Sequence, residues 1–126
     1  TTEIYTLSLH DALPIWNEAV NQGYEAKIIC GTRTYAEQND LYRQRPKVTN
    51  ARGGQSWHNF GLAWDFGIFQ DRNYLPNHPL YTTLGKLYAK IDGLEWGGTW
   101  KSFTDPPHLQ LHQFGSISEA RRSFET

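Results

Sequence analysis

The stretch of residues 56–65 reads SWHNFGLAWD and leads from a polar loop into an alternating segment. Large apolar side chains at positions 62, 64 and 66 alternate with alanine, aspartate and glycine, which is typical of a strand with two different faces. Asp65 therefore lies opposite the large side chains, where an ionised carboxylate needs a partner. His58 precedes it by seven positions, and the turn at residues 59–61 can bring the imidazole back beside Asp65. Both side chains are predicted to face one point.

A second alternating segment, HLQLH at residues 108–112, places His108 and His112 on the face opposite its two leucines. Residues 106 and 107 are both proline, whose fixed φ angles limit where the ring of His108 can go. Two imidazoles and one carboxylate suit zinc, and three protein ligands leave the fourth position for a water whose pKa the metal lowers. The predicted ligands are His58, Asp65 and His108. His112 shares a face with His108 and remains an alternative third ligand.

Hydrolysis also needs groups that do not bind the metal. Asp105 lies three residues before His108, separated from it by the two prolines, and is the predicted general acid/base. Arg33 lies on a turn between an expected strand and an expected helix. A fixed cation there would stabilise the negative charge that develops on an attacked amide oxygen. Glu95 is a rival base. A single histidine, aspartate or arginine more often has a structural role, so the prediction of a catalytic site depends on these residues occurring together.

The remaining sequence alternates short helical and strand patterns. Thr34 and Glu37 form a capping-box pair at the start of a helix that Pro46 must end, and the lone cysteine, Cys30, falls in an apolar run that predicts a buried strand. No strand is followed by a glycine fingerprint, so the pattern favours an α+β fold with a small, mostly antiparallel sheet and helices packed on one face. Helices are expected at residues 16–22, 35–45, 79–92 and 117–126, and strands at 26–30, 62–67 and 108–112.

Length and composition limit the classes of protein. A chain of 126 residues has room for one domain. The formal net charge of -1 provides no broad positive field for nucleic acid or anionic lipid. A single cysteine excludes a disulfide framework, and no run resembles a membrane span or a secretion signal. We therefore expect a monomer that neither binds nucleic acid nor inserts into a membrane. Trp96 and Trp100 are either core residues or walls of a groove.

Residues 56–65 resemble the S-x-H-x-x-G-x-A-x-D signature of the zinc D-alanyl-D-alanine carboxypeptidase family, with every signature position filled. This family includes the L-alanyl-D-glutamate endopeptidases of phage endolysins and bacterial cell-wall hydrolases. Residues 93–111, GLEWGGTWKSFTDPPHLQL, are similar to the second signature of the endopeptidase branch, in which an acid stands three residues before a histidine. Residues 31–44, GTRTYAEQNDLYRQ, resemble the segment that carries the family's catalytic arginine.

The resemblance implies the α+β fold, with a single zinc site, that the family shares with the signalling domain of Hedgehog. It also implies a zinc metallopeptidase that cuts the stem peptide of peptidoglycan at the bacterial cell wall, in the first place the L-alanyl-D-glutamate bond. A D-alanyl-D-alanine carboxypeptidase or dipeptidase is the alternative, and a non-catalytic zinc-binding module is a second one. The implied roles are zinc binding by His58, Asp65 and His108, catalysis by Asp105 and Arg33, and substrate contact by Ser56 and Gln38.

Residues 1–15 differ from the rest of the chain because they show no clear period. Part of this segment, YTLSLHDALPI, resembles translated read-through of a sequencing adapter. We therefore expect a non-native or disordered segment at residues 1–15 and the zinc peptidase domain at residues 16–126. Without a visible secretion signal, the protein is expected to reach the wall by another export route or by phage-type release.

Overall fold

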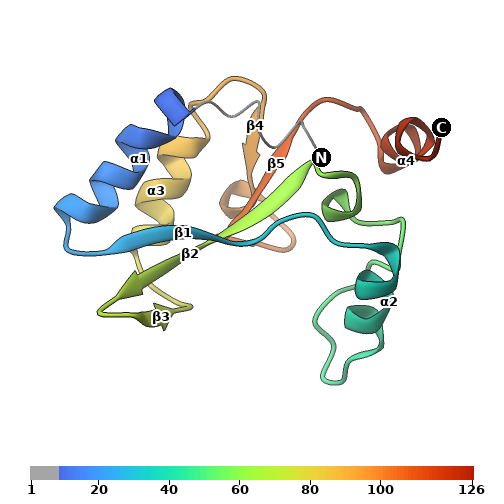
Figure 1. Cartoon of the computed structure of the whole chain (residues 1–126), viewed down its shortest axis with the longest axis horizontal. Helices are drawn as coiled ribbons and strands as arrows, with labels where there is room; N and C mark the ends of the chain where they lie inside the picture. The colour runs from blue at the N-terminus through green and yellow to red at the C-terminus, as the bar shows by residue number, and fades with distance from the viewer. Residues whose placement is uncertain (1–8) are drawn as a thin grey trace.

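The structure is a computed structural model that describes the backbone of residues 9–126 and the side chains from Leu13 onward (Figure 1). Within this part of the chain, no helix combines the length and the apolar character needed to cross a membrane. The elements in chain order are α1 (Leu9–Asn21), β1 (Glu25–Cys30), α2 (Tyr35–Arg43), η2 (Trp57–Phe60), β2 (Ala63–Gln70), β3 (Asn73–Leu75), α3 (Leu80–Tyr88), β4 (Leu94–Trp96), η3 (Gly97–Thr99), β5 (His108–Leu111) and α4 (Ile117–Glu125).

The strands form one antiparallel sheet around β2. The order is β1-β2-β5-β4, and β3 pairs with the C-terminal end of β2. This pairing places Asp65 of β2 opposite His108 of β5 on one side and opposite Cys30 of β1 on the other. Segments far apart in the sequence therefore meet at one point of β2. The architecture confirms the predicted α+β fold.

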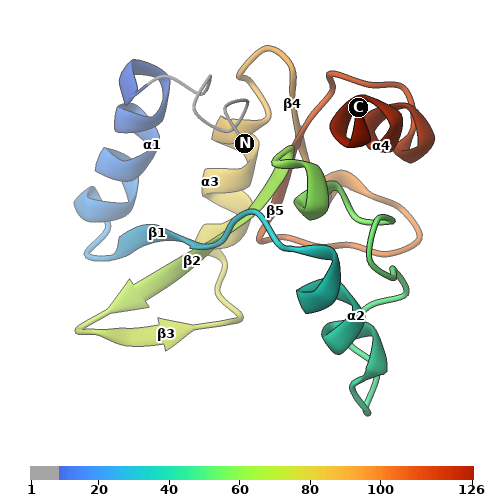
Figure 2. The same cartoon turned by 45° about the vertical axis from the view of Figure 1, so that its right-hand side comes forward.

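The hydrophobic core lies between the sheet and helices α1 and α3, which lie side by side in both views (Figures 1 and 2). β2 contributes Trp64, Phe66 and Ile68, which are at most 1% exposed. Burying each of these side chains stabilises the fold by about 1.5–3 kcal/mol. Because side chains alternate along a strand, the same register turns Asp65 away from the core. The core thus fixes the direction of the carboxylate.

Side-chain caps start two helices where the sequence predicted them. The hydroxyl of Thr34 accepts a hydrogen bond from the backbone nitrogen of Glu37, whose carboxylate accepts one from the backbone nitrogen of Thr34, which confirms the capping box of α2. Ser116 caps α4 through the backbone nitrogen of Glu119. α3 ends earlier than expected, at Tyr88, because the backbone nitrogens of Lys90 and Ile91 donate to carbonyls three residues back instead of four.

The N-terminal helix begins earlier than the sequence predicted. α1 starts at Leu9, so residues 9–15 are helical and not disordered, while residues 1–8 lie outside the described residues. Ile15 is 3% exposed and belongs to the core. Packing of Ile15 and Ala19 into the core accounts for the earlier start of the helix. Tertiary contacts contribute more to helix stability than local propensity does.

β1 is a strand, as predicted, but it is not buried. Ile28 and Ile29 are 47% and 44% exposed. The reason lies in the sheet order, because β1 is an edge strand that pairs only with β2 among the described residues. An apolar run cannot distinguish an edge strand from a central one, so this error follows from reading the run alone.

Candidate metal centre and catalytic pocket

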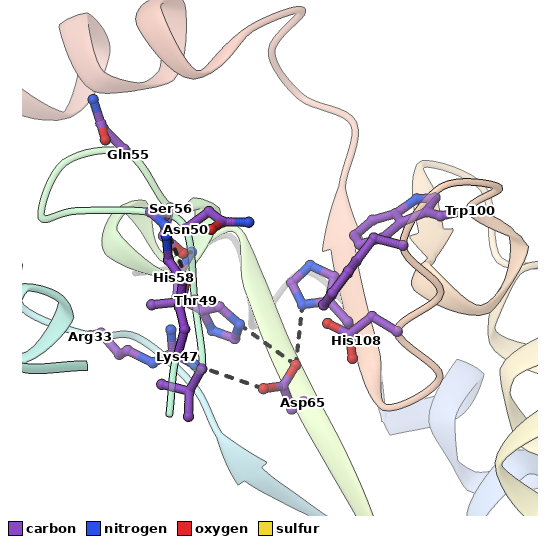
Figure 3. Close-up of a pocket in the computed structure, with 14 residues that line it drawn as sticks. Arg33, Lys47, Thr49, Asn50, Gln55, Ser56, His58, Asp65, Trp100 and His108 are labelled. Carbon is purple, nitrogen blue, oxygen red and sulfur yellow. Dashed lines mark hydrogen bonds and ion pairs between the residues drawn. The ribbon is translucent and has the colours of Figure 1, made fainter. Parts of the chain in front are cut away.

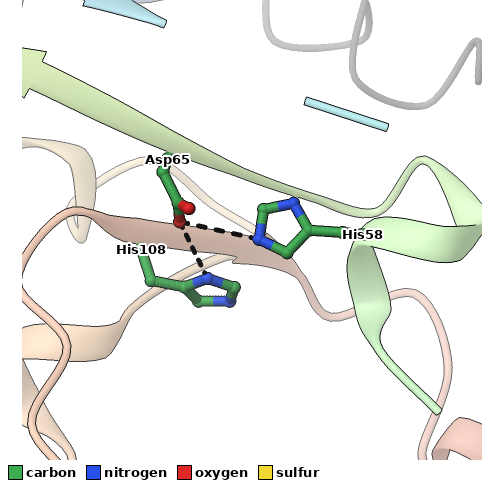
Figure 4. A group of neighbouring side chains, drawn as sticks. All are labelled: His58, Asp65 and His108. Atoms are coloured by element: carbon green, nitrogen blue, oxygen red, sulfur yellow. Dashed lines mark hydrogen bonds and ion pairs between the residues drawn. The ribbon is translucent and has the colours of Figure 1, made fainter. Parts of the chain in front are cut away.

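Three side chains from separate segments converge on the exposed face of β2 (Figure 4). Oδ1 of Asp65 lies 3.1 Å from Nδ1 of His108 and 3.6 Å from Nε2 of His58. Each residue offers one ligand atom, and the three atoms lie within 4.8 Å of one another. Asp65 comes from β2, His108 from β5 and His58 from η2. The structure thus brings together the three residues that the sequence predicted as ligands.

A backbone carbonyl fixes the tautomer of His58. Nδ1 of its ring lies 2.9 Å from the carbonyl oxygen of Gly31, which can only accept a hydrogen bond. Nδ1 therefore carries a proton in either charge state, which leaves Nε2, the nitrogen that faces Asp65, as the atom that can bind a metal. The ring is held at the start of η2, where the hydroxyl of Ser56 accepts from the backbone nitrogen of His58. The sequence stretch that decides the fold also orients this imidazole.

His108 is oriented by a side chain instead. Its Nε2 lies 2.8 Å from Oε1 of Gln110, which is buried on the same face of β5. An amide oxygen only accepts, so Nε2 donates to Gln110 in either charge state, and Nδ1 is the ring nitrogen that faces Asp65. Histidines that bind metals commonly donate their other ring nitrogen in this way. Gln110 thus supports His108 from outside the ligand set.

The charges of the cluster suit a cation. Burial opposes ionisation of Asp65, but hydrogen bonds from His108 and His58 outweigh it and hold the pKa of Asp65 well below its usual range. Burial also lowers the pKa of His58, yet hydrogen bonding to Asp65 and to Cys30 raises that pKa to about 9. The carboxylate is therefore ionised at neutral pH. A cation at this point would replace the proton that His58 otherwise holds.

The donor set fits zinc. Two imidazole nitrogens with fixed tautomers and one ionised carboxylate are ligands that zinc takes at catalytic sites, where three protein ligands leave a position open. The three ligand atoms are His58 Nε2, His108 Nδ1 and a carboxylate oxygen of Asp65. Among the described residues, no further histidine, cysteine, aspartate or glutamate joins these three.

The cluster lies in a pocket of about 800 Å³ (Figure 3). One wall is the segment 47–51 that follows α2, and the other is the segment 100–105 that precedes β5. Both catalytic groups predicted from the sequence line it together with the three ligands. The lining residues are Arg33, Lys47, Val48, Thr49, Asn50, Ala51, Gln55, Ser56, His58, Asp65, Trp100, Phe103, Asp105 and His108.

Asp105 is held by a tight loop between η3 and β5. Its backbone nitrogen donates to the carbonyl of Gly97 at 3.0 Å, and its carbonyl accepts from the backbone nitrogen of His108 at 3.1 Å. A Cβ at Gly97 would lie 2.4 Å from that carbonyl oxygen of Asp105, so only glycine permits this approach. Burial raises the pKa of the Asp105 carboxyl, the direction that suits a group that both accepts and donates a proton.

Arg33 lies across the pocket floor between three acceptors. Its Nη2 is 3.8 Å from Oδ2 of Asp65 and 3.2 Å from Sγ of Cys30, and its Nη1 donates to Oε1 of Gln38 at 2.9 Å. The guanidinium is one-fifth exposed, so it is both fixed and accessible from the pocket. Cys30 is half-buried beside it, and Arg33 is among the groups that lower the pKa of that thiol, after a hydrogen bond with His58.

One predicted substrate contact has a different position. Gln38 is completely buried and does not line the pocket, whereas Ser56 does. Both polar ends of Gln38 are occupied, because Oε1 accepts from Arg33 and Nε2 donates to the carbonyl of Ala51. The correction is that Gln38 does not face the pocket and instead holds the side chain of Arg33. The sequence places Gln38 in a helix next to a capping box, but it does not show whether the side chain points into the pocket or away from it.

The sequence left open the roles of Glu95, His112 and two tryptophans, and their positions in the structure distinguish these alternatives. Neither Glu95 nor His112 lines the pocket, and their side chains pair with each other at 3.0 Å. Trp96 is a core residue, while Trp100 is a pocket wall whose ring lies 5.2 Å from that of His108. Trp100 donates to the carboxylate of Glu95, so Glu95 holds the pocket wall from outside the pocket.

Several pocket residues were missed by sequence reasoning. The segment 47–51 and Phe103 carry no chemical signature, and only the fold reveals that they face each other across the ligands. Gln110 did have a signal, because strand alternation places it on the same face as His108.

Comparison with known proteins agrees with this geometry. The family model described as D-alanyl-D-alanine carboxypeptidase matches residues 49–111, which include all three ligands and Asp105. The chain belongs to this family. Over 107 residues it is 42% identical to the peptidoglycan L-alanyl-D-glutamate endopeptidase CwlK of Bacillus subtilis (strain 168). That match covers 74% of the chain and 64% of CwlK. The chain therefore spans less than two thirds of the length of CwlK.

Solved structures share the fold. The crystal structure of the L-Ala D-Glu endopeptidase ChiX of Serratia marcescens has a TM-score of 0.55 at 23% identity, covering 86% of this chain and 84% of ChiX. The vancomycin resistance D,D-pentapeptidase VanY, in complex with Zn(II), has a TM-score of 0.55 at 18% identity, covering 93% of this chain and 75% of VanY. At these identities the likeness shows a shared fold.

Proposed function

We propose that this protein is a zinc peptidase that hydrolyses the stem peptide of peptidoglycan, at the bond between L-alanine and D-glutamate. The carrying observation is that His58, Asp65 and His108 converge in one pocket with Asp105 and Arg33. A purely structural zinc needs neither a base nor a cation for the oxyanion and usually has four protein ligands. The accessible pocket therefore favours catalysis over a non-catalytic zinc-binding module.

Each group has a role that its position supports. Zinc held by His58, Asp65 and His108 would supply Lewis acidity towards the scissile carbonyl and lower the pKa of water. Asp105 accepts a proton from the attacking water and donates it to the nitrogen of the leaving amine. Arg33 donates hydrogen bonds to the oxygen on which negative charge develops.

The choice of bond depends on the relatives. CwlK, at 42% identity, is named an L-alanyl-D-glutamate endopeptidase, and ChiX has the same named specificity. VanY is named a D,D-pentapeptidase, and VanYB has been solved with D-Alanine-D-Alanine. The greater sequence identity with CwlK favours cleavage before D-glutamate. Removal of a terminal D-alanine is the second candidate, because the same ligand set serves both reactions.

Digestion of purified peptidoglycan tests the proposal. The zinc-loaded protein is incubated with the polymer, and new amino termini are identified by mass spectrometry, with the Asp105→Asn variant as control. New amino groups on glutamate are the expected result. Release of D-alanine would replace the proposal by its second candidate. Tight zinc binding without any new amino terminus would show that the protein is a non-catalytic module.

A further inference from the structure

The pocket contains a lysine that the proposed mechanism does not use. Lys47 is exposed and lines the pocket at the start of the wall segment 47–51 (Figure 3). The pocket's other cation, Arg33, is already engaged by Asp65, Gln38 and Cys30. Lys47 is therefore the cation of this pocket to which neither the protein's own acceptors nor the proposed mechanism assigns a role.

Within the described part of the chain, the charge of Lys47 has no acidic partner. Among the described residues, no carboxylate oxygen lies within 4.0 Å of the side-chain nitrogens of Lys47, Arg45 or Arg52, whereas Arg43 pairs with Asp40.

Lys47 and Arg52 both lie against the ring of Tyr42. Nζ of Lys47 lies 5.6 Å from the ring centre of Tyr42, and Cζ of Arg52 lies 4.9 Å from the same centre. Hydrogen bonding to Arg52 lowers the pKa of Tyr42, and the charge of Lys47 acts in the same direction. The positive potential beside the pocket is thus not neutralised locally, which favours an anionic ligand.

The backbone that carries Lys47 is fixed relative to the catalytic groups. The carbonyl of Ala51, at the end of the wall segment, accepts from the side chain of Gln38 at 2.9 Å, and its backbone nitrogen donates to Thr49 at 3.1 Å. Gln38 also holds Arg33. One buried side chain therefore ties the wall of Lys47 to the catalytic arginine, as a substrate subsite requires.

The proposed substrate carries an anion that a lysine can bind. In the stem peptide, the chain continues from the side-chain carboxyl of D-glutamate, so the α-carboxylate of that residue is free. We propose that Lys47, assisted by Arg52, forms a subsite for this free carboxylate, an inference that rests on the proposed function. The pair would make the enzyme prefer glutamate over its amide, isoglutamine, because an uncharged amide gains little from a cation.

Matched peptides test the subsite. Two synthetic stem peptides differ only in carrying D-glutamate or D-isoglutamine, and kcat/KM is measured for each with zinc-loaded enzyme. The expected preference for the glutamate peptide is roughly tenfold, the ordinary worth of a hydrogen bond to a charged group. It should disappear in Lys47→Met, survive in Lys47→Arg and shrink at high salt. Lys86→Met, an exposed lysine of α3 outside the pocket, is the control and should keep the preference.

A binding measurement separates this inference from the proposed function. Calorimetry with zinc-loaded Asp105→Asn protein gives the affinity for both peptides without turnover. If the wild type cuts neither peptide but Lys47 still determines tighter binding of the carboxylate form, the proposed function fails and the subsite stands. Equal preference in wild type and Lys47→Met, in cleavage or in binding, overturns the subsite and leaves the proposed function intact.

Discussion

Nη1 of Arg33 donates to Oε1 of Gln38 at 2.9 Å, and Gln38 is completely buried. The other end of the amide donates to the carbonyl of Ala51 in the pocket wall. A planar guanidinium held at one nitrogen by a buried amide keeps its second nitrogen in a defined direction. The position of the predicted catalytic cation therefore depends on a residue that the substrate does not touch.

Replacing Gln38 by leucine should lower kcat while zinc stays bound. Arg33 would lose its acceptor, and the carbonyl of Ala51 would lose its donor, so we expect a fall of roughly tenfold or more, in line with the loss of one positioned hydrogen bond to a charged group. Steady-state kinetics and metal analysis measure the two effects. Because both residues act as a unit, the Arg33→Lys/Gln38→Leu double variant should lose little more than the worse single variant. Fully additive losses would contradict the coupling.

The geometry of the cluster predicts that the ring of His58 is needed to bind the metal and that the ring of His112 is not. His58→Ala removes a ligand atom and should abolish stoichiometric zinc and activity together. His112→Ala is the matched control, because its ring is more than half exposed and pairs with Glu95 outside the pocket. It should keep most of both properties. Metal content by atomic emission, alongside turnover, decides between the rings. Loss of zinc in His112→Ala would reassign the third ligand.

Asp105→Asn should separate metal binding from proton transfer. The amide keeps the shape of the side chain but cannot accept the proton of the attacking water. Turnover should fall by roughly 10²- to 10⁴-fold, the usual contribution of a positioned acid/base. Zinc affinity should change little, because Asp105 is outside the ligand cluster. An unchanged kcat would remove Asp105 from its proposed role.

Sequence patterns located the ligands because strand alternation and the helical caps are local properties. The alternation at 62–67 gave the direction of Asp65, and the capping box gave the start of α2. Burial could not be predicted in the same way, since it depends on what packs against a residue. Ile28 was expected to be buried but lies on an edge strand, and Gln38 was expected in the pocket but lies beneath it.

Gln110→Leu should weaken zinc binding without removing a ligand. Its amide oxygen accepts from Nε2 of His108 and so leaves Nδ1, on the side of Asp65, as the ring nitrogen that can bind a metal. Loss of such a partner typically costs 10- to 100-fold in metal affinity. Competition with a chromophoric chelator measures this quantity, and NMR of the imidazole nitrogens reports the tautomer. Gln70→Leu, at the exposed end of β2, is the control. Equal zinc affinities in the two variants would show that Gln110 does not orient the ligand.

Gly85→Ala should destabilise the protein, although alanine ordinarily favours a helix over glycine by about 1 kcal/mol. A Cβ at Gly85 of α3 would lie 2.0 Å from Cε2 of Trp96, and the indole cannot move freely because Nε1 donates to the carbonyl of Pro106 at 2.7 Å. Overpacking of this kind costs about 1–3 kcal/mol, which corresponds to a melting temperature lower by roughly 3–10 °C. Gly115→Ala is the control, because its nearest neighbour would be a flexible carboxylate at 3.5 Å. Since Pro106 adjoins Asp105, the displaced indole should also reduce kcat at temperatures where the variant is fully folded. A melting temperature that rises in Gly85→Ala would show that Trp96 yields without cost and does not brace the catalytic loop.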